Sequence, residues 1–147
     1  IAEMLDYGIN VAIGTDGAAS NNSLNMIAET RLAGLVAKGR EGDATVLPSA
    51  TLLKMATING AQALGIAEQT GSLQAGKWAD VTAVNLDAPH CQPVYDPIAA
   101  LFYAADRSDV TDVWVAGKAL LEHGQPTILD AERIQARTQE WQSRIRG

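Results

Sequence analysis

A short apolar run, residues 11–15, ends at an acid, Asp16, and is followed at once by Gly17 and small polar residues. The run lacks an alternation of polar and apolar positions, a pattern typical of a strand that is buried on both faces. In α/β proteins the side chains at the carboxyl ends of such strands carry the chemistry. We therefore expect a buried strand over residues 11–15 and a functional position at Asp16.

Helical patterns flank this run on both sides. Residues 1–7 have helical spacing and stop at Gly8, a favourable residue just past a helix end. Beyond the loop, apolar residues recur at threes and fours, with Asn22 or Ser23 available as the cap. An order αβααα is expected over this first part. Its later helices are expected from residue 24 to near Gly39, from a cap at Ser49 through residues 52–56, and around residues 59–64.

The pattern changes after Gly71, where a turn-rich stretch leads into residues with strand character. Ala116 and Gly117 look like the two-residue turn of a hairpin. We expect a small separate sheet with strands at residues 81–85, 110–115 and 118–122, and a short helix or irregular segment at 97–105. A last helix is expected to be capped by Asp130, with Ile134, Trp141 and Ile145 on one stripe.

Composition narrows the partners of the chain. Its 147 residues carry a formal net charge of −6 and no basic block, which argues against nucleic acid and against an anionic membrane surface. No apolar stretch approaches the roughly 20 residues of a membrane span, so a cytoplasmic location is expected. The single cysteine, Cys91, excludes an internal disulfide framework and fits a reducing compartment.

The residues alone leave the role of Asp16 open. An acid beside glycines at a strand end can bind a metal, exchange protons with a metal-bound water, or cap the turn that follows it. Neither histidine, His90 or His123, lies in a paired ligand pattern, so the chain is not expected to complete a metal site unaided. A phosphate loop is disfavoured because the lysine of a P-loop is missing and Asp16 would repel phosphate.

Three ordered motifs carry a resemblance to a known family. They are residues 14–22 (GTDGAASNN), 55–65 (MATINGAQALG) and 71–80 (GSLQAGKWAD). Together they resemble the C-terminal third of the amidohydrolase superfamily, in the branch of the 5-methylthioadenosine/S-adenosylhomocysteine deaminases and chlorohydrolase-type enzymes. The resemblance covers nearly the whole chain.

The resemblance implies an α/β fold: the C-terminal end of a (β/α)₈ TIM-type barrel, with residues 11–15 as its last strand, plus part of a small β-sandwich domain. On that basis residues 1–70 belong to the barrel, residues 71–128 to the composite sandwich, and residues 129–147 form a C-terminal helix. The remaining part of the enzyme is then expected upstream of Ile1, and it would be a partner that this chain requires.

The resemblance also implies a function, the hydrolytic deamination of an adenine-type nucleoside, with one divalent metal ion, usually zinc. Asp16 would be a metal ligand and a catalytic residue in proton handling, and Asp16, Ser20 and Asn21 would contact the small-molecule substrate. The other ligands would lie upstream, so this chain alone is expected to be inactive, and homo-oligomers are expected from the family. The alternatives are a non-catalytic metabolite-binding or structural member of the same fold, and an enzyme acting on triazine or guanine-type substrates.

Overall fold

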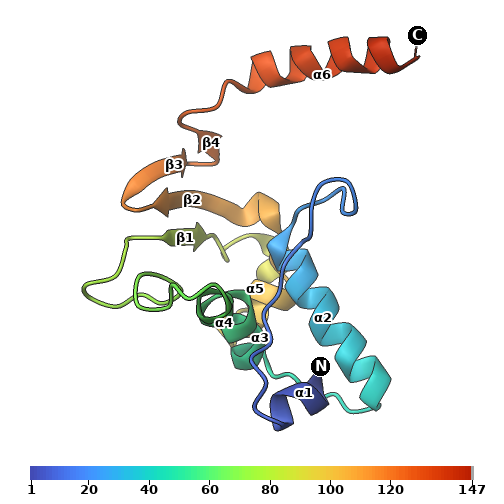
Figure 1. Cartoon of the computed structure of the whole chain (residues 1–147), viewed down its shortest axis with the longest axis vertical. Coiled ribbons are helices and arrows are strands. Elements are labelled where there is room, and N and C mark those ends of the chain that lie inside the picture. The colour runs from blue at the N-terminus through green and yellow to red at the C-terminus, as the bar shows by residue number, and fades with distance from the viewer. Residues whose placement is uncertain (147) are drawn as a thin grey trace.

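Short helices and one small sheet make up the structure, a computed structural model that describes residues 1–146 (Figure 1). The helical first part leads into an antiparallel sheet, and the chain closes with a long helix that stands apart from the rest. The elements are α1 (Ala2–Asp6), α2 (Met26–Glu41), α3 (Ser49–Ala56), α4 (Ile58–Ala63), β1 (Val81–Val84), the 3₁₀ turn η1 (Pro89–Cys91), α5 (Pro97–Tyr103), the 3₁₀ turn η2 (Arg107–Asp109), β2 (Val110–Val115), β3 (Lys118–Glu122), β4 (Gln125–Pro126) and α6 (Ala131–Arg146).

The core lies where α2, α3 and α5 meet. Leu52 and Met55 of α3 are fully buried there, and they pack with Phe102 of α5 and Ala37 of α2. Gly34 allows the close approach of α2, because a Cβ atom at this position would lie 2.9 Å from a Leu52 methyl carbon. Apolar residues at helical spacing in α3 therefore form the centre of the helical part, as their periodicity predicts. The expected cap at Ser49 was wrong, because Ser49 is the first residue of α3 and Pro48 occupies the N-cap position without a side-chain hydrogen bond.

Helix α2 begins and ends later than its apolar pattern suggests. Asn25 caps it, with its side-chain oxygen accepting hydrogen bonds from the N–H groups of Ile27 and Ala28. Leu24 has a left-handed φ of 47°, which a right-handed helix does not admit. The expected caps Asn22 and Ser23 were therefore wrong, whereas the expected end near Gly39 lies two residues from the observed one. The helix continues to Glu41 and stops at Gly42, which has a φ of 66°.

Residues 11–15 do not pair into a sheet within the described part of the chain. The N–H of Ile13 donates to the Met55 carbonyl at 3.0 Å, and the side-chain amide of Asn59 donates to the Val11 carbonyl at 2.9 Å. Val11 and Ile13 are half-buried against the core, whereas Ala12 is exposed. The expectation of a strand buried on both faces is thus not met, because a strand of this kind needs neighbouring strands, and none lies beside it among residues 1–146.

The sheet has four antiparallel strands in the order β1-β2-β3-β4. The turn between β2 and β3 has positive φ angles at Ala116 (50°) and Gly117 (76°), the conformation of a tight hairpin, as predicted. Asp80 ties this turn to the preceding loop, because its carboxylate accepts hydrogen bonds from the Thr70 hydroxyl at 2.6 Å and the Ala116 N–H at 2.7 Å. Only this one sheet is found in the described residues.

Helix α6 follows β4 and has no buried residue. Asp130 caps it as expected, with a carboxylate oxygen 2.9 Å from the N–H of Arg133. No helix within residues 1–146 combines the length and the apolar character that crossing a membrane requires.

Candidate functional site around Asp16

Asp16 lies at the end of the extended segment and turns the chain into the loop that precedes α2. Its φ of 60° is a left-handed conformation that aspartate tolerates better than most residues. One carboxylate oxygen accepts the N–H of Gly17 at 2.7 Å, and the other accepts the hydroxyl of Ser20 at 2.6 Å. The turn-capping role that the sequence left open for Asp16 is therefore observed, and Ser20 lies beside it.

The same two hydrogen bonds set the charge state of this acid. The Ser20 hydroxyl, and then the Gly17 N–H, hold the pKa of Asp16 below its ordinary value of 3.8. Asp16 is therefore ionised at neutral pH, and its side chain is exposed. An ionised carboxylate with open surroundings can bind a cation or accept a proton.

Asn21 points to a different partner. Its side-chain amide donates to the Glu29 carboxylate on α2 at 2.6 Å, while its oxygen accepts the N–H of Ser23 at 2.9 Å. It forms no hydrogen bond with Asp16 or Ser20 in the described residues. Asn21 therefore fastens the loop to α2 in this structure, and Asn22, the cap that the sequence suggested, is exposed.

An apolar groove runs beside the segment that leads to Asp16. Residues 11–14, one face of α2 and Met55 of α3 contribute to its lining. Glu29, the partner of Asn21, is the one charged residue of its lining. The lining consists of Ile1, Val11, Ala12, Ile13, Gly14, Glu29, Leu32, Ala33, Val36 and Met55.

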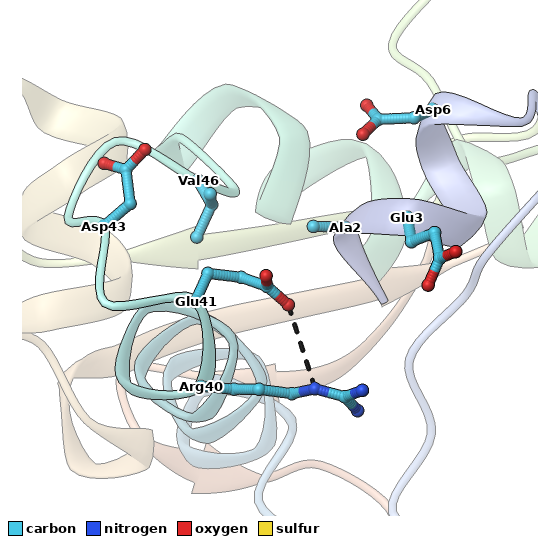
Figure 2. Close-up of a pocket in the computed structure, with 7 residues that line it drawn as sticks. All are labelled: Ala2, Glu3, Asp6, Arg40, Glu41, Asp43 and Val46. Atoms are coloured by element: carbon cyan, nitrogen blue, oxygen red, sulfur yellow. Dashed lines mark ion pairs between the residues drawn. The ribbon is translucent and has the colours of Figure 1, made fainter.

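A second hollow lies at the opposite end of α2, between that helix and α1 (Figure 2). Three acidic residues, Glu3, Asp6 and Asp43, contribute to its lining. Two further lining residues, Arg40 and Glu41, form an ion pair with a nitrogen–oxygen distance of 3.8 Å. Helix α2 has 16 residues, so about 24 Å of helix separates this hollow from the Asp16 loop. The hollow therefore contributes nothing to the candidate site.

Sequence reasoning missed one polar cluster, formed by His90, Cys91 and Asp109. The donor atoms of these three residues lie within 4.8 Å of one another, and they are the one group of three potential metal-binding side chains found in residues 1–146. His90 Nε2 lies 2.9 Å from a carboxylate oxygen of Asp109, which also accepts the N–H of Asp106. Burial raises the pKa of the Cys91 thiol, so this cysteine is a protonated core residue at neutral pH.

The chemistry of Asp16 fits one position of a metal site and no more. Carboxylate oxygen is an ordinary ligand of zinc and of harder divalent ions. Catalytic zinc sites use three protein ligands, and Asp16 belongs to no group of three donor side chains in the described residues. A complete centre at Asp16 therefore requires donors from outside residues 1–146.

Comparison with known proteins places the chain in a family. Residues 1–120 match the profile of the amidohydrolase family. A 5-methylthioadenosine/S-adenosylhomocysteine deaminase of Moorella thermoacetica is 54% identical over 136 residues, which cover 92% of this chain and 32% of that protein. The chain thus spans about a third of the length of the curated relatives that it matches.

Solved structures give the same result. A crystal structure of an adenosine deaminase from Xanthomonas campestris with bound zinc is 43% identical, with a TM-score of 0.95 over 99% of this chain and 33% of that chain. An atrazine chlorohydrolase from Arthrobacter aurescens, in complex with zinc, is 35% identical, with a TM-score of 0.87 over 95% of this chain and 31% of that chain. The chain belongs to the amidohydrolase family.

Proposed function

We propose that this chain is the C-terminal part of a metal-dependent aminohydrolase that replaces the amino group of an adenine-type nucleoside with oxygen and releases ammonia. The observation that supports it most strongly is the close likeness, over almost the entire chain, to a zinc-containing adenosine deaminase. The identity to 5-methylthioadenosine/S-adenosylhomocysteine deaminases favours these two compounds as substrates.

In this proposal residues 1–70 complete a TIM-type barrel. Residues 11–15 become its last strand, and neighbouring strands from the rest of the enzyme cover the side of the segment that is open here. The alternating burial of Val11, Ala12 and Ile13 supports this, because side chains of a strand alternate between its two faces. Residues 71–128 contribute to a β-sandwich, and α6 is the terminal helix.

Asp16 is the residue of this chain that we propose as a metal ligand, with the remaining ligands in the rest of the enzyme. A divalent metal ion, zinc by likeness to the solved relatives, would supply Lewis-acid activation of water at neutral pH. The Ser20 hydroxyl donates to the Asp16 carboxylate and orients it, and in this proposal the carboxylate accepts a proton from the attacking water. Ser20 and Asn21 then border the substrate.

The test is an activity and metal assay of the complete polypeptide that contains this chain. We expect one divalent metal ion per polypeptide and ammonia release from 5-methylthioadenosine or S-adenosylhomocysteine, lost on chelation and restored by zinc. Residues 1–147 expressed alone serve as the control and should be inactive. Stoichiometric binding of these nucleosides without turnover would instead support a non-catalytic metabolite-binding member of the family.

A second candidate is the hydrolysis of a triazine, because the triazine hydrolases reach 35% identity to this chain. Both reactions displace a substituent from an electron-poor nitrogen heterocycle. Including atrazine and guanine in the same assay separates the candidates. Turnover of atrazine with none of the adenine nucleosides would assign the triazine reaction.

A further inference from the structure

Helix α6 has an apolar stripe without a partner. Ile134, Trp141 and Ile145 recur at intervals of seven and four and therefore lie along one side of the helix. Trp141 is 50% exposed and Ile145 is 82% exposed, and no residue of α6 is buried. Ile128 and Leu129, exposed in the connection before the helix, extend the apolar surface.

The body of the chain does not hold this helix in place. Figure 1 shows α6 standing away from the sheet and the other helices. In the described part of the chain, the hydrogen bonds of residues 130–146 stay local, such as those from Arg133 to Asp130 and from Thr138 to Ile134. A 16-residue helix is only marginally stable in water, and most of its stability in proteins comes from packing an amphipathic face. The helix therefore needs a surface to pack against.

The position of α6 is nonetheless the one found in a solved relative. The helix contains 16 of the 147 residues, too large a share to be displaced in a superposition that reaches a TM-score of 0.95 over 99% of the chain. That relative has about two thirds of its length outside the match. A helix that keeps its place apart from the other elements of the chain needs a partner, and the unmatched part of the relative can provide one.

We propose that α6 packs its Ile134–Trp141–Ile145 stripe against the part of the same polypeptide that corresponds to the unmatched two thirds of the relatives, and so ties the end of the chain to the rest of the enzyme. This rests on the proposal that the chain works as part of a longer enzyme. Arginines border the stripe, and Arg144 lies over the Trp141 ring at 4.5 Å, an arrangement of apolar centre and polar rim common to protein interfaces.

The test follows Trp141 in the complete polypeptide labelled with 5-fluorotryptophan. Its fluorine resonance is assigned as the signal that vanishes in Trp141→Phe, and its exposure is measured with a soluble paramagnetic quencher. We expect quenching several-fold weaker than that of a free peptide of residues 130–147, and unchanged over a hundredfold dilution. Quenching equal to the peptide's would overturn the proposal. So would protection that disappears on dilution, which would identify a second copy as the partner.

A stability measurement complements this readout. Trp141→Ala should lower the Tm of the complete polypeptide by several degrees, whereas Gln139→Ala, on the opposite side of α6, should leave it unchanged. Equal effects of the two substitutions would contradict a role of the stripe. Neither readout depends on turnover, so a failure of the proposed deaminase activity would leave this result standing, and the reverse holds as well.

Discussion

At the scale of single residues, backbone conformation and close contact decide which positions tolerate change. Asp16 adopts a left-handed conformation at the candidate site, and its two carboxylate oxygens are held by Ser20 and Gly17. Gly71 and Gly76 also have left-handed φ angles, of 88° and 92°. Only at Gly71 does a second constraint add to this, because a Cβ atom there would lie 2.7 Å from the Ala61 Cβ.

These two glycines provide a matched pair for a stability test. Gly76→Ala introduces left-handed strain alone, at a cost of about 1 kcal/mol in the free energy of unfolding. Gly71→Ala adds a collision with Ala61 and the Ile58 backbone, so we expect a loss of about 3 kcal/mol. Denaturant unfolding of the complete polypeptide measures both. Equal losses would show that the contact with α4 is absent in solution.

At the scale of elements, local sequence patterns predicted the helices and the hairpin. They failed where a contact with a residue far away in the sequence determines the structure. The periodicity of Leu52 and Met55 and the Ala116–Gly117 turn were sufficient signals, because each depends on neighbours in the sequence. The start of α2 was misplaced because Asn25 has a second partner, Asp106, 81 residues away. The pairing of His90 with Asp109 likewise has no signal in the local sequence.

The candidate site was predictable only in part, for the same reason. The run ending at Asp16 and the nearby Ser20 are local features, and the structure brings these two side chains together. An apolar run specifies burial without specifying which strands provide it, so residues 11–15 indicate a strand but not its neighbours. The direction of Asn21 depends on Glu29 of α2, and was missed as well.

A charge swap tests the link between α2 and η2. Asn25 is 8% exposed and donates to the Asp106 carboxylate at 2.6 Å while it caps α2. Asn25→Asp keeps the cap but replaces the hydrogen bond to Asp106 with a repulsion between two carboxylates. We expect a loss of about 1 to 2 kcal/mol in unfolding free energy. The double variant Asn25→Asp with Asp106→Asn reverses donor and acceptor.

The double variant should therefore recover most of the stability, as thermal or denaturant unfolding can measure. A loss in the double variant equal to the sum of the two single losses would show that the two side chains do not interact.

At the scale of the whole molecule, lowered aspartate pKa values predict acid sensitivity. Hydrogen bonds to the carboxylates lower the pKa of the residues concerned, among them Asp16 through Ser20, Asp80 through Thr70 and Asp109 through His90. A pKa lower in the fold than in the unfolded chain stabilises the fold fully above the unfolded value, about 3.9 for aspartate. This stabilisation is lost as the pH falls through the lower folded value.

Thermal unfolding between pH 2 and pH 7 measures this effect. We expect the contribution of these aspartates to the Tm to be constant above about pH 5 and to fall steeply below pH 4. Asp80→Asn should lower the Tm at neutral pH and make the acid fall shallower. A Tm unchanged down to pH 2 would contradict the hydrogen bonds assigned to these carboxylates.

We propose Asp16 as the metal ligand that this chain contributes to an amidohydrolase active site. The most direct measurement is the metal content and deaminase turnover of the complete polypeptide carrying Asp16→Asn, beside Asp80→Asn. Asp80 is a matched control, since it too accepts one hydroxyl and one backbone N–H. We expect Asp16→Asn to lower both the metal content and the turnover by about a hundredfold. Asp80→Asn should leave the metal content and the turnover unchanged. Full metal content and turnover in folded Asp16→Asn would contradict the claim.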